Sequence, residues 1–194
     1  MNGVVAIKKG PRRNRLRPLI WGAAAALLAL PALAMFFAPA AGVNWTLGDF
    51  IAMGVLLSIA CGVYELGALL SGNTFYRAGF GLAALTGFLT IWVNLAVGML
   101  GGEDGSANLT FAGVLLIAAA GALVAGFKPL GMSRAMAAAA IAQLLAVGAG
   151  VWMGQFEPHE LTFTAIFALP WMASALLFRK AAADHHGIAS PRQS

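Results

Sequence analysis

The sequence predicts an all-α membrane protein, a bundle of six transmembrane helices with both termini in the cytoplasm. Its 194 residues are 60% hydrophobic and only 10% charged, whereas roughly a quarter of the residues of soluble proteins are charged. Hydropathy rises in six stretches of about 20 residues, the length that crosses a hydrocarbon core roughly 30 Å thick. All 12 Lys and Arg residues lie in the tails or in alternate connections, and cationic loops stay in the cytoplasm.

The first span is predicted over residues 19–38, where Pro31 removes one backbone hydrogen bond and is expected to kink the helix. The basic leader before it, together with Ala38-Pro39-Ala40 after it, looks like a secretory signal peptide. Signal peptides have apolar runs of about 7–15 residues, and this run is longer. We therefore predict a retained span; cleavage is the alternative, which would leave five spans and an external N-terminus.

Five further spans are predicted over residues 50–70, 78–100, 111–127, 135–153 and 161–178, the last with a second kink at Pro170. Every connection is short, so residues 18–180 are predicted to form one transmembrane domain without a soluble module. The tails are polar, and we expect them to be disordered beyond the helix ends. They comprise residues 1–17 and 181–194.

The three helices that run from the outside to the inside begin with similar segments. A threonine in each can accept a hydrogen bond from an unpaired backbone N–H, as helix caps do. A repeat of three helix hairpins is one interpretation; the common use of polar caps beside interfacial aromatic residues is the other. The segments are Asn44-Trp45-Thr46-Leu47, Asn108-Leu109-Thr110-Phe111 and Glu160-Leu161-Thr162-Phe163.

Glu65 is the only acidic residue within a predicted span, roughly 8 Å below the inner edge at 1.5 Å per residue. Burying a charge in lipid costs free energy, so the carboxylate needs a partner or a proton. Arg77 is the nearest cation beyond the turn, and Tyr64 and Tyr76 add hydroxyl groups. The group is interpreted either as a proton- or cation-handling site or as a structural pair that locks the second and third helices together.

A second polar group is predicted at the outer side, around a glycine-rich turn. It comprises Asn94, Glu103, Asp104 and Asn108. Carboxylate and amide oxygens are the ligands that Ca²⁺ and Mg²⁺ prefer, although the spacing matches no EF-hand loop. A solvated acidic turn is the alternative. About 15 Å of bilayer separates Asn94 from Glu65, so the two groups are not expected to form one site.

The sequence predicts no enzyme, because it contains no H-E-x-x-H, C-x-x-C, G-x-S-x-G or phosphate-binding glycine loop. The three histidines lie outside the predicted spans, so no haem-binding pair is expected. We predict no cofactor and no metal ligand set. The net charge of +5 is interpreted as a topology signal that also attracts anionic inner-leaflet lipid, and not as a nucleic-acid surface.

Two segments together resemble a family of small, uncharacterised bacterial multi-pass inner-membrane proteins. They are Tyr64-Glu65 with 71–78, and Trp92-Val93-Asn94-Leu95-Ala96-Val97-Gly98 leading to Glu103-Asp104 and Asn108. This chain has Gly105-Ser106-Ala107 where the family is expected to have Asn-Pro-Ala, which weakens a ligand role for the loop. The resemblance implies a bacterial inner-membrane location and no known activity.

The leading functional hypothesis is a non-catalytic structural, assembly or partner-binding component of that membrane. It rests on the scarcity of polar groups in the spans and the abundance of small residues, which let helices pack closely in lipid. Its expected partners are the bilayer and a membrane protein or a second copy of the chain. The alternative is a small transporter or ion-handling protein that uses Glu65 or the outer acidic turn.

Overall fold

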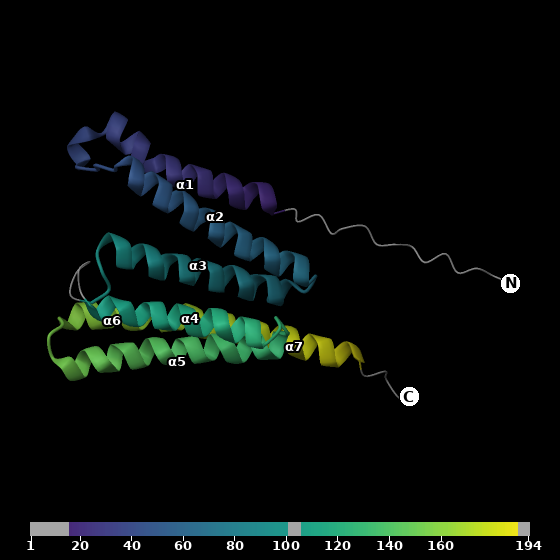
Figure 1. Ribbon diagram of the computed structural model, residues 1–194. Coiled ribbons are helices and arrows are strands. Elements are labelled where there is room, and N and C mark those ends of the chain that lie inside the picture. The colour runs from purple at the N-terminus through teal and green to yellow at the C-terminus, as the bar shows by residue number, and fades with distance from the viewer. Residues whose placement is uncertain (1–15, 101–105, 190–194) are drawn as a thin grey trace.

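The computed structural model describes residues 16–100 and 106–189, and every regular element in these ranges is a helix (Figure 1). The predicted all-α fold is therefore confirmed for the described residues. The tail residues 1–15 and 190–194, and the turn 101–105, lie outside them. The helices are α1 (Arg17–Phe37), α2 (Leu47–Leu70), α3 (Thr74–Ala96), α4 (Leu109–Val124), α5 (Pro129–Met153), α6 (Pro158–Ile166) and α7 (Ala168–Ala189), with short 3₁₀ turns η1 (Pro39–Ala41) and η2 (Ser106–Asn108).

Five helical segments of the described chain are long and apolar enough to cross a membrane. They are α1, α2, α3, α5 and the continuous stretch Pro158–Asp184 that contains α6 and most of α7. Helix α4 is apolar but has only 16 residues, or about 24 Å at 1.5 Å per residue. The predicted fourth span, 111–127, thus corresponds to a helix shorter than a full crossing.

The two prolines inside predicted spans behave differently. Pro31 lies within α1, which continues as one helix through it. The last span is interrupted at Phe167, between α6 and α7, three residues before Pro170. Because Pro170 has no N–H to donate to the carbonyl of Ile166, the helical ladder is weakened at this point, and Phe167 instead donates to Thr164 O at 3.2 Å.

The chain also differs from prediction at its C-terminal side, where α7 continues to Ala189, into residues predicted as a disordered tail. Ala181 and Ala182 are 0% and 7% exposed, so this part of α7 packs on the bundle. Asn73, before α3, donates from Nδ2 to Asp184 Oδ2 at 2.8 Å. Packing and this contact extend the helix beyond the apolar stretch that hydropathy detects.

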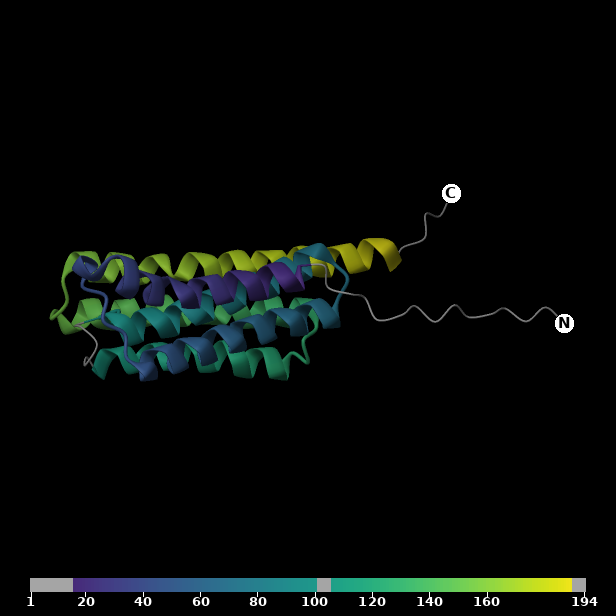
Figure 2. The same ribbon diagram turned by 90° about the horizontal axis from the view of Figure 1, so that it is seen from above.

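The helices lie side by side along one axis (Figures 1 and 2). Helix α7 packs between α5 and α3, α4 packs on α5, and α2 packs on the other side of α3. The core under α7 is aromatic: the rings of Tyr76 and Phe178 are 5.2 Å apart, and those of Phe80 and Phe178 are 5.6 Å apart, both edge to face. Helix α1 contacts the bundle through α2 and has no buried residue.

Helix α1 begins, and α7 ends, at the same end of the bundle (Figure 1). The α2–α3 and α4–α5 turns lie at that end as well, so the described basic side chains gather there. They are Arg17, Arg77, Lys128, Arg134, Arg179 and Lys180. At the opposite end, Asp49 lies in the first turn of α2, and Glu157 and Glu160 lie at the start of α6. The helix order is thus the one that the alternation of charge predicted.

One of the three predicted threonine caps is present. Thr46 Oγ1 accepts from Asp49 N at 3.3 Å, while Asp49 Oδ2 accepts from Thr46 N at 2.7 Å, which forms a capping box at the start of α2. Thr110 and Thr162 instead donate to the carbonyls of Ala107 and Pro158. Because the three threonines do not share one role, the caps give the proposed hairpin repeat no support.

Candidate functional site

Glu65 lies on α2 near the basic end of the bundle and is paired with α1. Its Oε1 is 2.9 Å from Arg17 Nε and accepts a hydrogen bond from Trp21 Nε1 at 2.6 Å. The Glu65 side chain is 23% exposed, and that of Arg17 is 66% exposed. The carboxylate is therefore balanced by one cation and one neutral donor, both on α1.

The sequence indicated Arg77 as the partner of Glu65, whereas the ion pair in the structure is with Arg17. Arg17 was assigned to the basic leader because it precedes the apolar run. It is in fact the first residue of α1, and Trp21 follows it by four residues. Side chains at i and i+4 lie on the same helix face, so this spacing is the signal that would have predicted a two-donor site for a carboxylate.

Arg77 and Tyr64 form a separate contact between α3 and α2. The Arg77 guanidinium donates to Tyr64 Oη at 3.4 Å, and both side chains are half-buried. Gly81, one turn further along α3, leaves room for the tyrosine ring, since a Cβ at this position would lie 3.2 Å from Tyr64 Cδ2. Arg77 thus joins the second and third helices, as the structural interpretation expected, but through Tyr64.

Tyr76 belongs to another part of the fold. Its hydroxyl donates to the carbonyl of Phe127 at 2.7 Å, in the turn between α4 and α5. Phe127 has a φ of +58°, a left-handed conformation that non-glycine residues seldom adopt. The Tyr76 hydrogen bond satisfies the carbonyl of this strained residue. The structure therefore brings Tyr64 and Arg77 together, but assigns Tyr76 to the α4–α5 turn.

The amides of the predicted outer site bind backbone groups. Asn108 Oδ1 accepts from Met99 N and Leu100 N at 2.9 and 3.0 Å, and Asn94 Nδ2 donates to Thr90 O at 2.7 Å. Glu103 and Asp104 lie outside the described residues. Within the described residues no group of three or more His, Cys, Asp or Glu side chains could hold a metal ion. Two donors occupy the Asn108 oxygen, which leaves it poorly placed to be a metal ligand.

Buried polar contacts that the sequence did not predict tie the helices together toward the end of the bundle opposite the basic residues. Gln143 on α5 donates to Thr164 O at 3.0 Å, and Thr164 Oγ1 donates to Met99 O at 3.0 Å. Gln143 and Thr164 are both 0% exposed. Other isolated polar residues bond within their own helix, as expected: Ser58 to Gly54 O, Thr86 to Leu82 O and Thr90 to Thr86 O.

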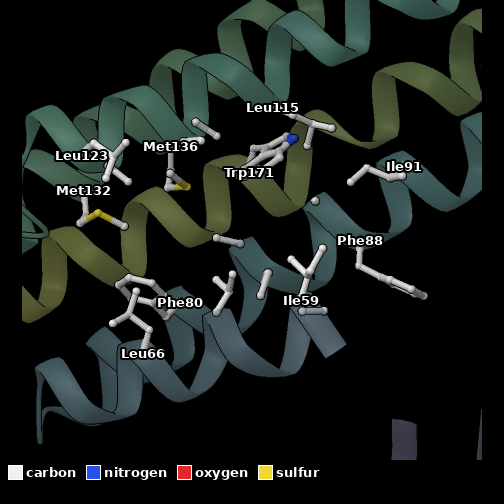
Figure 3. Close-up of a pocket in the computed structure, with 18 of the residues that line it drawn as sticks. Ile59, Leu66, Phe80, Phe88, Ile91, Leu115, Leu123, Met132, Met136 and Trp171 are labelled. Atoms are coloured by element: carbon white, nitrogen blue, oxygen red, sulfur yellow. The ribbon is translucent and has the colours of Figure 1, made fainter. Parts of the chain in front are cut away.

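An apolar groove of about 430 Å³ lies between α2 and α4, over α3 (Figure 3). We call it the α2–α4 groove. Its walls include Ile59 and Leu66 on α2 and Leu123 on α4, which are 58%, 38% and 68% exposed, so the groove opens to the side of the bundle. Small residues line much of it: Ala60, Ala83, Ala84, Gly87, Ala118, Ala119 and Ala122. Trp171, Met132 and Met136 close its deep side.

No model of a known protein family, no curated protein and no solved structure matches this chain. The likeness of the Trp92-Val93-Asn94 segment to bacterial inner-membrane proteins therefore rests on the sequence alone.

Proposed function

We propose that the chain is a non-catalytic component of the bacterial inner membrane that binds a transmembrane helix of a partner protein in the α2–α4 groove. The observation that carries this proposal is the groove itself, an apolar hollow of about 430 Å³ that opens to the side of the bundle. A side opening faces the surrounding membrane, so an apolar segment can enter laterally.

The lining of the groove favours a helix as the occupant. In lipid, helices associate by close van der Waals packing, and small residues let two backbones approach. The alanines and Gly87 supply such a surface, while Ile59, Leu66 and Leu123 supply exposed side chains on either side of it. Among the described residues, no charged side chain lines the groove, and the lining offers no acid, base or nucleophile for catalysis.

The transporter alternative has less support. Its central residue, Glu65, already binds Arg17 and Trp21. Among the described residues, Glu65 lines neither the α2–α4 groove nor the two hollows between α1 and α3. A cation carrier requires a carboxylate that is free to bind its cation, and the Glu65 carboxylate is held against α1 by Arg17 and Trp21.

Photo-crosslinking in membranes tests the proposal, with a crosslinking amino acid at Ala119 or Ala120. Both side chains are exposed on α4, but only Ala119 lines the groove. Position 119 is expected to give a protein product of discrete mass that position 120 does not give. A product of twice 20.0 kDa would identify a second copy of the chain as the occupant. Crosslinks to lipid alone at position 119 would overturn the proposal.

A blocking variant gives an independent readout. With the crosslinker moved to Ile59 across the groove, Ala119→Trp is expected to remove most of the product because its indole fills the groove. Ala120→Trp adds the same side chain outside the groove and is expected to leave the product unchanged. Equal products from the two variants would contradict docking in this groove.

A further inference from the structure

A second hollow follows the other side of α2, between α1 and α3. Two adjoining cavities form it, of about 420 and 360 Å³, and they share Tyr64, Gly81 and Leu85 in their linings. We call it the α1–α3 cleft. It begins at the basic end of the bundle beside Thr74 and Arg77 and continues toward the bilayer centre to Leu27, Leu57 and Phe88.

The cleft is polar only at its mouth. Thr74, Arg77 and the hydroxyl of Tyr64 are the polar groups there, and Arg77 is half-buried in the cleft wall. Beyond Tyr64 the lining is apolar, supplied by α1, α2 and α3: Ile20, Ala24, Leu27, Ala60, Ala84 and Leu85. This is the lining expected for an amphiphile with one polar end.

The charge at the mouth selects an anion. Arg17 and Arg77 are the described cations beside this part of α2, and the Glu65 carboxylate is held by Arg17. Of these two described cations, Arg77 lines the cleft, and its planar guanidinium, which also donates to Tyr64 Oη, has several N–H groups that suit phosphate oxygens. It also lies in the first turn of α3, where the helix dipole favours negative charge.

The length of the cleft matches one leaflet. Arg77 and Phe88 are eleven residues apart on α3, which is about 17 Å along the helix axis at 1.5 Å per residue. Half of a hydrocarbon core is about 15 Å. A head group at Arg77 and an acyl chain that extends to Phe88 would therefore occupy the leaflet on the basic side of the protein.

We infer that the α1–α3 cleft binds an anionic phospholipid, with its phosphate at Arg77 and Tyr64 and one acyl chain along α1 and α3. The site differs from the α2–α4 groove, whose described lining residues include no cation, and it does not depend on the function proposed for that groove. The lipid would fill the space between α1 and the bundle, where direct packing is sparse because α1 has no buried residue and packs mainly on α2.

Native mass spectrometry of the full-length protein in mild detergent tests this inference, with phosphatidylglycerol and phosphatidylcholine added in equal amounts. One phosphatidylglycerol is expected to be retained in preference to phosphatidylcholine. Arg77→Gln removes a charge-assisted contact and is expected to weaken retention about tenfold. Ala78→Trp, at an exposed position of the cleft lining, is expected to block the mouth and weaken it to a similar extent.

Two matched controls separate the cleft from general attraction to a basic surface. Arg134→Gln removes an exposed arginine at the same end of the bundle, on α5. Ala120→Trp adds the same side chain outside the cleft, at another exposed alanine near a helix end. Ala120 lies four residues before the end of α4, and Ala78 lies four residues after the start of α3. Both controls are expected to retain the lipid as the parent protein does.

Three results would overturn the inference: equal retention of the two lipids by the parent protein, an equal loss in Arg134→Gln, or unchanged retention in Ala78→Trp. If Arg77→Gln does not fold, the lipid preference of the parent protein and the lipid retention of Ala78→Trp still test the inference. Displacement of phosphatidylglycerol by millimolar glycerol phosphate would show that the head group suffices, which would also overturn the role of the acyl chain.

Discussion

At the scale of single residues, Glu65 shows how a carboxylate on an apolar helix is stabilised by a neighbouring helix that packs only lightly. Arg17 and Trp21 reach it from α1, at 2.9 and 2.6 Å. A charge left unpaired among apolar helices would cost free energy, so the pair favours the docked position of α1 on α2. These polar contacts add to the apolar contacts of Ala24 and Leu28, since α1 has no buried residue.

We predict that Arg17→Gln and Glu65→Gln are coupled. Arg17 is 66% exposed, which keeps the interaction near the value for surface ion pairs, about 0.2–1 kcal/mol. Each single change is expected to lower the unfolding free energy, and the double change is expected to cost less than the sum of the two. Unfolding of the purified protein by titration with a denaturing detergent measures the three variants.

The control for this cycle is Arg134→Gln with Glu65→Gln. Arg134 is an exposed arginine on α5, away from the Glu65 site, so its effect is expected to add to that of Glu65→Gln. Strictly additive losses for Arg17 and Glu65 would contradict the pair. Near-normal stability of Glu65→Gln together with a lost cellular phenotype would favour the transport alternative.

At the scale of helices, the sequence predicted the elements well and their contacts poorly. Apolar length predicted the ends of α1, α2 and α3 to within four residues, because an apolar stretch of span length marks a helix directly. It predicted the end of α5 but placed its start six residues too late, at 135 instead of Pro129. Apolar length could not predict that α7 extends past residue 178, because that extension is stabilised by buried alanines and by the hydrogen bond between Asn73 and Asp184. Nor could it predict the partner of Glu65, because the nearest cation in sequence need not be the nearest in space.

The same limit applies to glycines, whose roles depend on what lies opposite. Gly113 and Gly121 are both on α4. A Cβ at Gly121 would lie 2.7 Å from Ala135 Cβ and 3.3 Å from its Cα on α5, whereas a Cβ at Gly113 would meet nothing within 4 Å. Nothing in the sequence distinguishes the two positions.

We predict that Gly121→Ala destabilises the α4–α5 contact, since Ala135 presents backbone that cannot rotate away. Overpacking of this kind costs about 1–3 kcal/mol. Gly113→Ala is the matched control on the same helix and is expected to be neutral or slightly stabilising, because alanine is the better helix former. Thermal unfolding in one detergent compares the two, and equal melting temperatures would contradict the close packing of α4 on α5.

At the scale of the whole molecule, the sequence predicted where the basic residues lie but not where the hollows lie. The helix order places the described basic residues at one end, as the alternation of charged loops predicted, because a single rule of translocation acts on every loop. The two hollows on either side of α2 were not predicted. The position of each hollow depends on which apolar helix faces remain apart after packing. The sequence does not reveal this, because apolar composition is nearly the same along all the helices.

The topology itself is the final prediction. Because all 12 Lys and Arg residues belong to one set of connections and tails, that side is expected to be cytoplasmic. Reporter fusions after Ser133 and Ser194 should be active only as cytoplasmic markers, and a fusion after Pro158, at the start of α6, only as a periplasmic marker. The 16-residue α4 makes the Ser133 fusion decisive. If α4 did not cross, Ser133 would report the periplasm, the later helices would be inverted, and Ser194 would report the periplasm with it.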